Sequence, residues 1–254
     1  EEREEYEPVV AMGAVIYAGI DYEKILRQAE EEADVIVWDG GNNDTPFYLP
    51  QVAIVVFDPH RAGHETAYHP GETNMLMADI AVINKVDSAD PAAVAAVRRT
   101  IAAHNPDADI VLADSALLVD APERIRGRRV LVVEDGPTVT HGDMPFGAGV
   151  IAARRFGAEA LVDPRPHLVG SLQETFAAYP RIGTLLPAMG YGEGQVRDLE
   201  ATINTTPCDL VVSATPVDLT RLMSIAKPVV HIRYTYRDHD PATLKKALLR
   251  RLKV

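Results

Sequence analysis

The sequence predicts an α/β fold in which a mainly parallel sheet is flanked by helices and is followed by a second α/β unit. Two observations support this prediction. Short apolar runs alternate along the whole chain with longer segments of helical periodicity, as they do in β-α-β units. Several of these runs end in Asp, Asn or Gly, which is typical of buried parallel strands that run into tight turns.

The first 126 residues are expected to form one domain with five strands. Its clearest helix follows the fourth strand, because Asp90 can cap that helix and Pro91 suits the first helical position. An earlier helix is expected after Asp21, whose side chain can accept a hydrogen bond from the first turn. The expected strands are 13–17, 35–38, 52–57, 80–83 and 110–112, and the expected helices are 21–33 and 91–104.

Residues 127–254 are expected to form the second domain, with a substrate-binding role. The segment Glu134-Asp135-Gly136-Pro137 is interpreted as a turn that leaves the first strand of this domain. The same alternation of short apolar runs and helical segments continues to the end of the chain. The expected strands are 130–133, 160–162, 210–212 and 229–232, and the expected helices are 148–156, 171–178, 192–204 and 241–252.

Composition argues against several classes of partner. The 254 residues carry a net charge of −12, so we expect no nucleic-acid partner, which would require a basic face. No apolar run approaches the roughly 20 residues that a membrane-spanning helix needs, so we expect no membrane partner. Cys208 is the single cysteine, which excludes an intrachain disulfide and favours a cytoplasmic location. The sequence leaves the oligomeric state open, including a homo-oligomer.

The segment Asn84-Lys85-Val86-Asp87 follows an expected buried strand and has the pattern N-K-x-D. The Asp carboxylate can accept hydrogen bonds from N1 and N2 of guanine, and the Asn side chain can bond to N7. The Lys stem can cover the base or the loop. A polar turn between a strand and a helix is the alternative interpretation. We interpret the segment as a nucleotide-binding loop, because a second nucleotide element lies upstream.

That upstream element ends in Asp39-Gly40-Gly41, after another expected buried strand. A carboxylate at such a strand end can position Mg²⁺, so Asp39 is a candidate metal ligand and catalytic residue. The two glycines would let backbone N–H groups approach a γ-phosphate, whereas an ordinary Asp-Gly turn is the alternative. Ser115, after the next strand, is a further candidate for contact with the base or a residue of a simple turn.

The chain lacks the phosphate-binding loop that accompanies these elements in P-loop NTPases. Neither a G-x-x-x-x-G-K-[ST] segment nor a Gly-Lys dipeptide occurs in the 254 residues. The predicted fold is therefore P-loop NTPase-like but incomplete. We expect an N-terminal P-loop segment outside this chain, or a partner chain, to supply the loop; a rearranged sheet is the alternative.

Basic residues in several loops are candidates for holding the phosphates of an anionic substrate. One of these loops is the glycine-rich stretch 136–149, which precedes a helix whose free N–H groups would form an anion site. The histidine in that stretch could also transfer a proton, which makes it a catalytic candidate. The alternative is a moving switch loop or ordinary exposed histidines for the loop that begins at His60, a merely structural loop for 136–149, and a surface turn for Arg165 and His167. The candidates are His60, Arg61, His64, His141, Arg165 and His167.

Seven stretches spread over the chain support one family resemblance when they are taken together. They read V-I-V-W-D-G-G-N-N-D, D-P-H-R-A-G-H, H-P-G-E-T-N, A-V-I-N-K-V-D, V-V-E-D-G-P-T-V-T-H-G, V-D-P-R-P and L-P-A-M-G-Y-G. In these stretches the chain resembles the cyclic 2,3-diphosphoglycerate synthetase-like proteins, also described as predicted GTPases of the P-loop class. Full-length members of that family carry an additional N-terminal domain and a Walker A loop.

The resemblance implies a ligase that joins the two phosphates of 2,3-bisphosphoglycerate into a cyclic anhydride with ATP and Mg²⁺. It further implies that Asp39 positions the metal and that Asn84 and Asp87 read the base. Because N-K-x-D favours guanine, both ATP and GTP stay open as the nucleotide. The alternatives are a GTPase of regulatory or metal-chaperone type and a ligand-binding module without catalysis. We expect the isolated chain to bind nucleotide weakly and not to turn it over.

Overall fold

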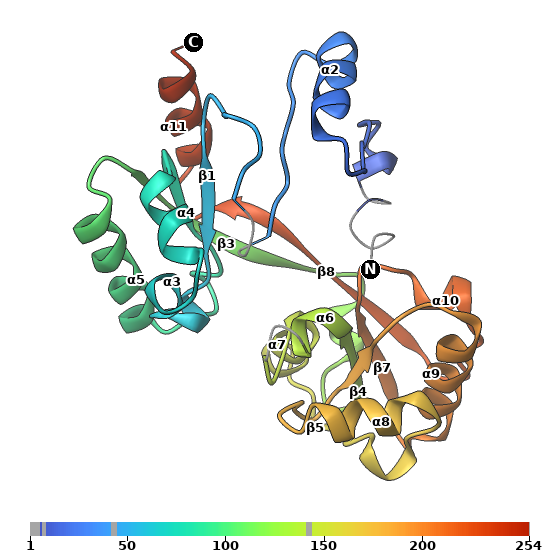
Figure 1. Cartoon of the computed structure of the whole chain (residues 1–254). Coiled ribbons are helices and arrows are strands. Elements are labelled where there is room, and N and C mark those ends of the chain that lie inside the picture. The colour runs from blue at the N-terminus through green and yellow to red at the C-terminus, as the bar shows by residue number, and fades with distance from the viewer. Residues whose placement is uncertain (1–5, 7–8, 42–44, 141–143, 254) are drawn as a thin grey trace. The chain divides into compact units, whose positions relative to one another are not determined.

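The computed structural model describes residues 6, 9–41, 45–140 and 144–253. The chain forms two compact units, each assembled from two segments. Unit 1 comprises residues 1–14 and 117–235, and unit 2 comprises residues 15–116 and 236–254. The chain passes from unit 2 into unit 1 along β3 (Asp109–Val119) and returns along β8 (Val229–Asp238) (Figure 1). The predicted division, by contrast, is a single cut after residue 126.

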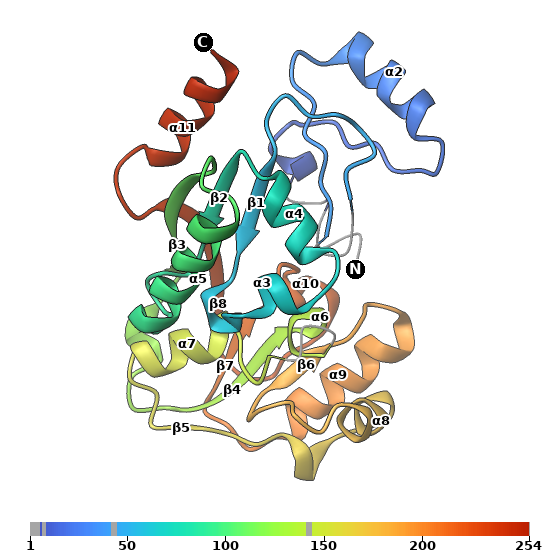
Figure 2. The ribbon, with the colours of Figure 1, turned by 60° about the vertical axis from the view of Figure 1, so that its left-hand side comes forward.

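The sheet of unit 2 consists of parallel strands in the order β1 (Ile54–Phe57), β2 (Ile80–Ile83) and β3. Their register aligns Phe57, Ile83 and Leu112, so the three strands reach the carboxyl edge of the sheet together. Figure 2 shows β1 and β2 side by side. The first connection contains the 3₁₀ helix η1 (Pro59–Arg61), α3 (His64–Ala67) and α4 (Gly71–Met77).

Both faces of this sheet are covered by helices. On one face, α4 and α5 (Pro91–His104) pack Met75, Val97 and Ile101 against Ala81 and Ile83. On the other face, the C-terminal helix α11 (Thr243–Leu252) packs against Ile80, Val82 and Val111 through Ala247. Buried β2 is apolar on both faces, as expected for a central parallel strand.

Two of the strands predicted in the first domain are wrong. Residues 13–17 and 35–38 have no strand structure, and Val35 and Val37 are 77% and 83% exposed. An apolar run becomes a strand only where neighbouring strands accept its backbone hydrogen bonds and cover its side chains. The predicted helix before these residues does form, as α2 (Tyr22–Glu32), with Asp21 as its N-cap.

The sheet of unit 1 is also parallel in its described pairs. Its central strand is β4 (Arg129–Asp135), which pairs with β7 (Leu210–Ala214) on one side. On the other side, β4 pairs first with β5 (Ala160–Leu161) and then with β6 (Leu186–Ala188). Beyond β7 lies the first part of β8. The short helices η2 (Pro122–Arg124) and α6 (Gly136–Val139) flank β4 along the chain.

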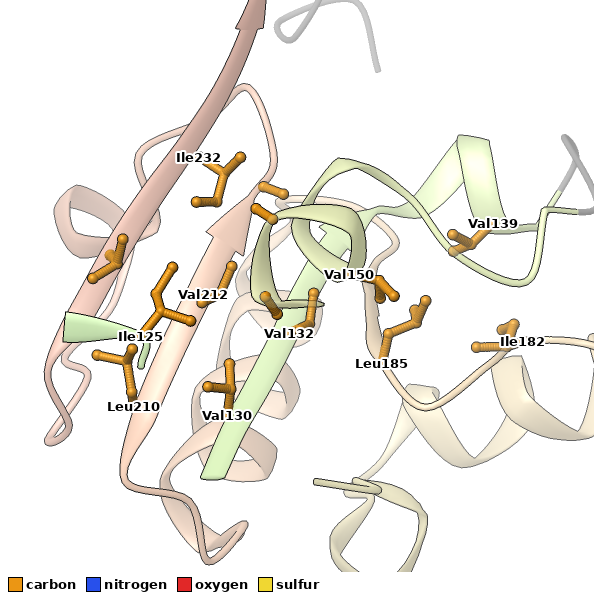
Figure 3. Packing of buried hydrophobic residues seen from close by; sticks show 14 residues of the cluster. Ile125, Val130, Val132, Val139, Val150, Ile182, Leu185, Leu210, Val212 and Ile232 are labelled. Carbon is orange, nitrogen blue, oxygen red and sulfur yellow. The ribbon is translucent and has the colours of Figure 1, made fainter. Parts of the chain in front are cut away.

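Two apolar clusters cover the faces of this sheet. The first packs α7 (Ala148–Arg155) on alternate residues of β4 and β7, including Val130, Val132 and Val212 (Figure 3). The second packs α8 (Ser171–Ala178), α9 (Glu193–Thr205) and α10 (Leu219–Leu222) on the opposite face, against Leu131 and Val133. The 3₁₀ helix η3 (Arg165–His167) follows β5.

The α/β fold class, with a mainly parallel sheet flanked by helices and a second α/β unit, is confirmed. One predicted turn is wrong, because β4 continues through Glu134 to Asp135 instead of turning at Glu134. Backbone pairing with both β6 and β7 keeps these two acidic residues in the sheet. Within the described part of the chain, no helix combines the length and the apolar character required to cross a membrane.

Candidate functional site

Polar residues gather at the carboxyl edge of the sheet of unit 2, where β1 and β2 end and β3 continues. Asp58 follows β1 and Asn84 follows β2. Asp114 and Ser115 come soon after Leu112, the residue of β3 that aligns with the last residues of β1 and β2. Ligands of parallel α/β sheets bind at this edge, because the loops there converge while the strands hold them in place. The structure therefore brings the predicted loop 84–87 next to Ser115. The prediction that Ser115 follows the strand is wrong, because β3 continues through Ser115 to Val119.

Backbone hydrogen bonds hold the N-K-x-D loop against both neighbouring strands. The Asn84 N–H donates to Phe57 O at 3.0 Å, and the Val86 N–H donates to Ala113 O at 3.0 Å. Between them, Lys85 has a φ of 59°, in the left-handed region that few residues other than glycine adopt. Backbone conformations of this kind concentrate at functional sites. The backbone of the loop is thus held in a defined conformation.

Asp87 and Ser115 are in direct contact. The Ser115 N–H donates to Asp87 Oδ1 at 3.1 Å, which orients the carboxylate at the end of the loop. A carboxylate that is already oriented can accept N–H groups of a ligand without losing further side-chain freedom. This contact joins two of the residues that the sequence predicts for nucleotide binding.

Asp58 organises the basic residues of this edge, and sequence reasoning missed it. Its Oδ2 accepts a hydrogen bond from Lys85 Nζ at 2.6 Å, and its Oδ1 accepts from the His60 backbone N–H at 3.0 Å. The His60 ring in turn lies 3.0 Å from Ser88 Oγ through Nε2. The Lys85 ammonium therefore pairs with Asp58, and the Lys85 stem crosses from the end of β2 to the end of β1. His64 begins α3 farther along the chain, is exposed and contacts the Tyr68 ring.

Two buried polar atoms at this edge have no hydrogen-bond partner among the described residues. They are Asn84 Oδ1 and Arg61 Nε, one an acceptor and the other a donor of a charged group. Leaving such an atom buried without a partner costs about 1–3 kcal/mol, so native proteins rarely keep one without a reason. A ligand that supplies both a donor and an acceptor would satisfy this pair.

Asp114 supports the loop from behind and was also missed by the sequence analysis. It is 5% exposed and accepts hydrogen bonds from Arg237 at 2.8 Å and from His239 Nδ1 at 2.9 Å. Burial by itself raises the pKa of Asp114, but the hydrogen bonds and charges of Arg237 and His239 outweigh it and lower the pKa below its usual value. Since Asp114 immediately precedes Ser115, these contacts fix the position of the Ser115 N–H.

Asp39, Gly40 and Gly41 lie in an irregular, exposed segment of unit 2 and not at the end of a strand. A Cβ on Gly40 would lie 2.0 Å from the Trp38 ring, so a larger residue at this position would displace the ring. Among the described residues, no group of three or more His, Cys, Asp or Glu side chains could hold a metal ion. Mg²⁺ needs only one or two carboxylates when phosphates and water complete its shell, so the Asp39 site stays a prediction.

The remaining candidates belong to unit 1 or lie outside the described residues. Arg165 donates hydrogen bonds to Asp163 Oδ1 at 2.9 Å and to the Ile182 carbonyl, and its guanidinium lies 5.0 Å from the centre of the Phe176 ring. These contacts give Arg165 a structural role in its loop. His167 ends η3 and is partly buried. His141 lies outside the described residues.

The expected anion site at the start of α7 is occupied by a side chain of the protein itself. Glu134 Oε1 accepts the N–H groups of Val150 at 2.9 Å and Gly147 at 3.1 Å. A Cβ on Gly147 would lie 2.5 Å from the same carboxylate, so glycine is needed there for the close approach of Glu134. Burial, which outweighs the backbone hydrogen bonds, raises the pKa of Glu134 to about 7, and the charge of Asp135 adds to the rise. The anion-site interpretation of this helix terminus is therefore corrected.

No known family model matches the chain. The chain is 55% identical over 248 residues to a curated protein of Thermococcus kodakarensis named arginine synthetase ArcE. The similarity covers 98% of this chain and 55% of the relative, so the chain spans about half the length of that protein. The name of this relative mentions neither cyclic 2,3-diphosphoglycerate nor a GTPase, so it does not confirm the family that the sequence resembles.

Proposed function

We propose that this chain is part of a nucleotide-using synthetase that forms arginine. Its 55% identity to a protein named arginine synthetase, over nearly the whole of this chain, supports the proposal. A synthetase of this kind is a ligase, which drives bond formation by cleavage of a nucleotide. The proposal keeps the ligase class predicted from the sequence and replaces its substrate.

The observation that carries the nucleotide part is the contact between Asp87 and Ser115 beside the unsatisfied Asn84 oxygen. Asp87 would accept N–H groups of the base. The Asn84 amide nitrogen would donate to N7, and its unsatisfied Oδ1 would accept a further N–H group of the ligand. The buried Arg61 Nε, at the end of β1, would donate to a phosphate oxygen. A carboxylate acceptor at Asp87 favours guanine, which offers two N–H donors there, so GTP is the first nucleotide to test and ATP the second.

Mg²⁺, when bound through Asp39 and phosphate oxygens, would neutralise charge on the phosphates. We further propose that the phosphate-binding loop comes from a P-loop-bearing strand outside these 254 residues. Exposed apolar side chains in unit 2 support this: Val56 on β1 is 64% exposed, and Val35 and Val37 are exposed as well. An exposed apolar edge of this kind is otherwise an aggregation hazard in a parallel sheet.

Formation of cyclic 2,3-diphosphoglycerate from 2,3-bisphosphoglycerate is the second candidate. The observation that favours it is the concentration of His60, Arg61 and His64 within five residues after β1. Several basic donors are what a site for two adjacent phosphates requires. A regulatory GTPase and a binding module without catalysis also use the N-K-x-D loop, and turnover separates them from a ligase.

Calorimetric titration of the chain with Mg-GTP and Mg-ATP tests the nucleotide site. We expect weak binding, and we expect Asp87→Asn to lower the affinity for GTP about a hundredfold, because two charge-assisted hydrogen bonds to the base are lost. Asp90→Asn is the matched control, since an Asn at this exposed helix cap keeps the hydrogen bond from the Ala92 N–H. Unchanged GTP affinity in Asp87→Asn would contradict the proposed base contact.

The same titration with L-arginine and with 2,3-bisphosphoglycerate separates the two candidate substrates. We expect L-arginine to bind and 2,3-bisphosphoglycerate not to bind. Binding of 2,3-bisphosphoglycerate alone, lost in His60→Ala, would overturn the arginine proposal in favour of the second candidate. Steady nucleotide hydrolysis by this chain without any other segment would contradict the need for a P-loop strand from outside.

A further inference from the structure

Unit 1 has its own pair of buried polar atoms without a hydrogen-bond partner among the described residues. They are Asp135 Oδ1, at the end of β4, and Ser213 Oγ, near the end of β7. Ser213 as a whole is 1% exposed. A buried hydroxyl and a buried carboxylate oxygen both carry a substantial cost unless a donor reaches them.

These two atoms lie on the same face of the sheet. The register pairs Val133 with Ser213 and Glu134 with Ala214 on adjacent strands. Since side chains alternate along a strand, Asp135 and Ser213 share the face of Val133, and Glu134 points to the opposite face toward α7. Below Asp135 and Ser213 this face is the apolar cluster around Leu131, so the pair forms its polar rim at the carboxyl edge.

The position of Asp135 is set by its surroundings. Its Oδ2 accepts a hydrogen bond from Thr138 Oγ1 at 2.7 Å, and the backbone of the next residue lies so close to Ala188 that a Cβ on Gly136 would be 2.2 Å from the Ala188 oxygen. The other carboxylate oxygen is thereby held in place without a donor. Asp135 Oδ1 is buried without a hydrogen-bond partner in the part of the chain that the structure describes.

The segment after β7 carries a further carboxylate near this position. Asp218 Oδ1 lies 3.6 Å from His231 Nε2, and Asp218 Oδ2 lies 3.4 Å from Arg221 Nε. Glu134 lies on the other face of β4, and its raised pKa of about 7 leaves it partly protonated at neutral pH. His231 is the register partner of Ser213 on β8. His231 therefore has Asp218 as its own acidic partner.

We propose that Asp135 and Ser213 bind the cationic nitrogen of an amino-acid substrate or product, a guanidinium or an ammonium group. This inference rests on the proposed function, because arginine carries both groups. A guanidinium presents several N–H donors in one plane, which suits a carboxylate oxygen on one strand and a hydroxyl on the next. The substrate nitrogen would supply the donors that the pair lacks in the protein.

Calorimetric titration of the 254-residue chain with L-arginine, agmatine and L-norleucine tests the inference. Agmatine keeps the guanidinium and lacks the carboxylate, whereas norleucine keeps the amino-acid backbone and an apolar chain of similar length. We expect L-arginine and agmatine to bind more tightly than norleucine. Asp135→Asn should weaken both guanidinium ligands at least about tenfold, because a charge-assisted hydrogen bond is lost.

Asp120→Asn is the matched control, since Asp120 is a carboxylate of the same unit that pairs with Arg233 at an exposed position. Equal loss in both variants, or no loss in either, overturns the proposed site. Ser213→Ala provides a second variant if Asp135→Asn does not fold, with an expected loss of a few-fold. If Ser213→Ala keeps full affinity in that case, the proposal fails as well.

The outcomes also separate this inference from the proposed function. Binding of agmatine that depends on Asp135, without binding of L-arginine, would support the cation site and count against arginine as the product. Binding of L-arginine that is unaffected in Asp135→Asn and Ser213→Ala would support the proposed function and overturn this site. Binding of nucleotide with neither guanidinium ligand would overturn the site and leave the nucleotide part of the proposal standing.

Discussion

Asp114 in unit 2 and Glu134 in unit 1 are both buried carboxylates on strands of a sheet, and they have opposite environments. Asp114 in unit 2 faces Arg237 and His239, which lower its pKa despite burial. Glu134 in unit 1 faces backbone N–H groups, and burial raises its pKa to about 7. The edge of unit 2 therefore combines both signs of charge, as an anionic ligand with a polar base requires, whereas the edge of unit 1 is acidic.

The unsatisfied atoms differ in the same sense. In unit 2 the pair consists of the Asn84 acceptor and the Arg61 donor, and in unit 1 it consists of the Asp135 and Ser213 oxygens. The first pair suits a nucleotide, which carries acceptors and donors, and the second suits a nitrogen cation, which carries donors. If both proposals hold, a few side chains adapt two units with parallel sheets to opposite ligands, in keeping with the rule that fold does not determine function.

Among the experiments that test this difference between the two units, the pH dependence of the unfolding free energy should show the largest effect. Because the folded-state pKa of Glu134 is raised from 4.5 to about 7, its contribution to stability is fully present below the lower value and is lost as the pH rises through the upper one. Relative to Glu134→Gln, the wild-type protein should therefore lose up to about 3 kcal/mol of unfolding free energy between pH 5 and pH 8. Urea denaturation across this pH range measures the difference.

Glu159→Gln is the control for this experiment, because Glu159 is an exposed carboxylate of the same unit. It should leave the slope of stability against pH unchanged. Parallel pH profiles for wild-type protein and Glu134→Gln would mean that the helix terminus compensates fully for burial. The two units would then no longer differ in how they neutralise a buried carboxylate.

Removing a cation from unit 2 is expected to have the next largest effect. Arg237→Ala leaves the buried Asp114 with His239 as its remaining basic partner, and we expect a loss of about 2 kcal/mol in unfolding free energy. Arg233→Ala breaks the exposed ion pair with Asp120 and should cost less than about 1 kcal/mol. Chemical denaturation at neutral pH compares the two variants.

Equal losses for the two arginine variants would mean that the burial of Asp114 does not strengthen its ion pair. If the Asp114 contacts also position the Ser115 N–H, then Arg237→Ala should weaken nucleotide binding, whereas Arg233→Ala should not. A nucleotide affinity that is the same in both variants would limit the role of Asp114 to stability.

Much of the fold could be predicted from the sequence. The helices 91–104 and 171–178 and the strand 80–83 have the predicted boundaries, because caps, prolines and short apolar runs are local signals. The two wrong strands, at 13–17 and 35–38, are apolar runs of the same kind. A sequence pattern records the apolar residues but not whether neighbouring strands are present to pair with them.

The candidate site was predictable only where its residues are close in sequence. The loop 84–87 is a contiguous motif, and Ser115 lies within β3, whose first residues form a recognisable apolar run. By contrast, Asp114 meets Arg237 and His239 across more than 120 residues, and no local pattern indicates that contact. Glu134 was misread because an acidic residue at a strand end is ordinarily solvated, whereas here tertiary packing buries it against the start of α7.

The smallest expected effect concerns the Ser213 hydroxyl of unit 1, whose removal should stabilise the protein. Ser213→Ala removes a buried oxygen that has no hydrogen-bond partner among the described residues, so we expect the unfolding free energy to rise by about 1 kcal/mol. Thr206→Val is the matched control, since the Thr206 hydroxyl is equally buried but donates to Thr202 O at 2.7 Å, and its loss should destabilise by about 1 kcal/mol. Denaturation curves of both variants give the two signs directly. A destabilised Ser213→Ala would show that the hydroxyl already has a hydrogen-bond partner within the protein. The polar rim formed by Asp135 and Ser213 would then lose the unsatisfied hydroxyl that distinguishes a ligand-binding edge from a structural one.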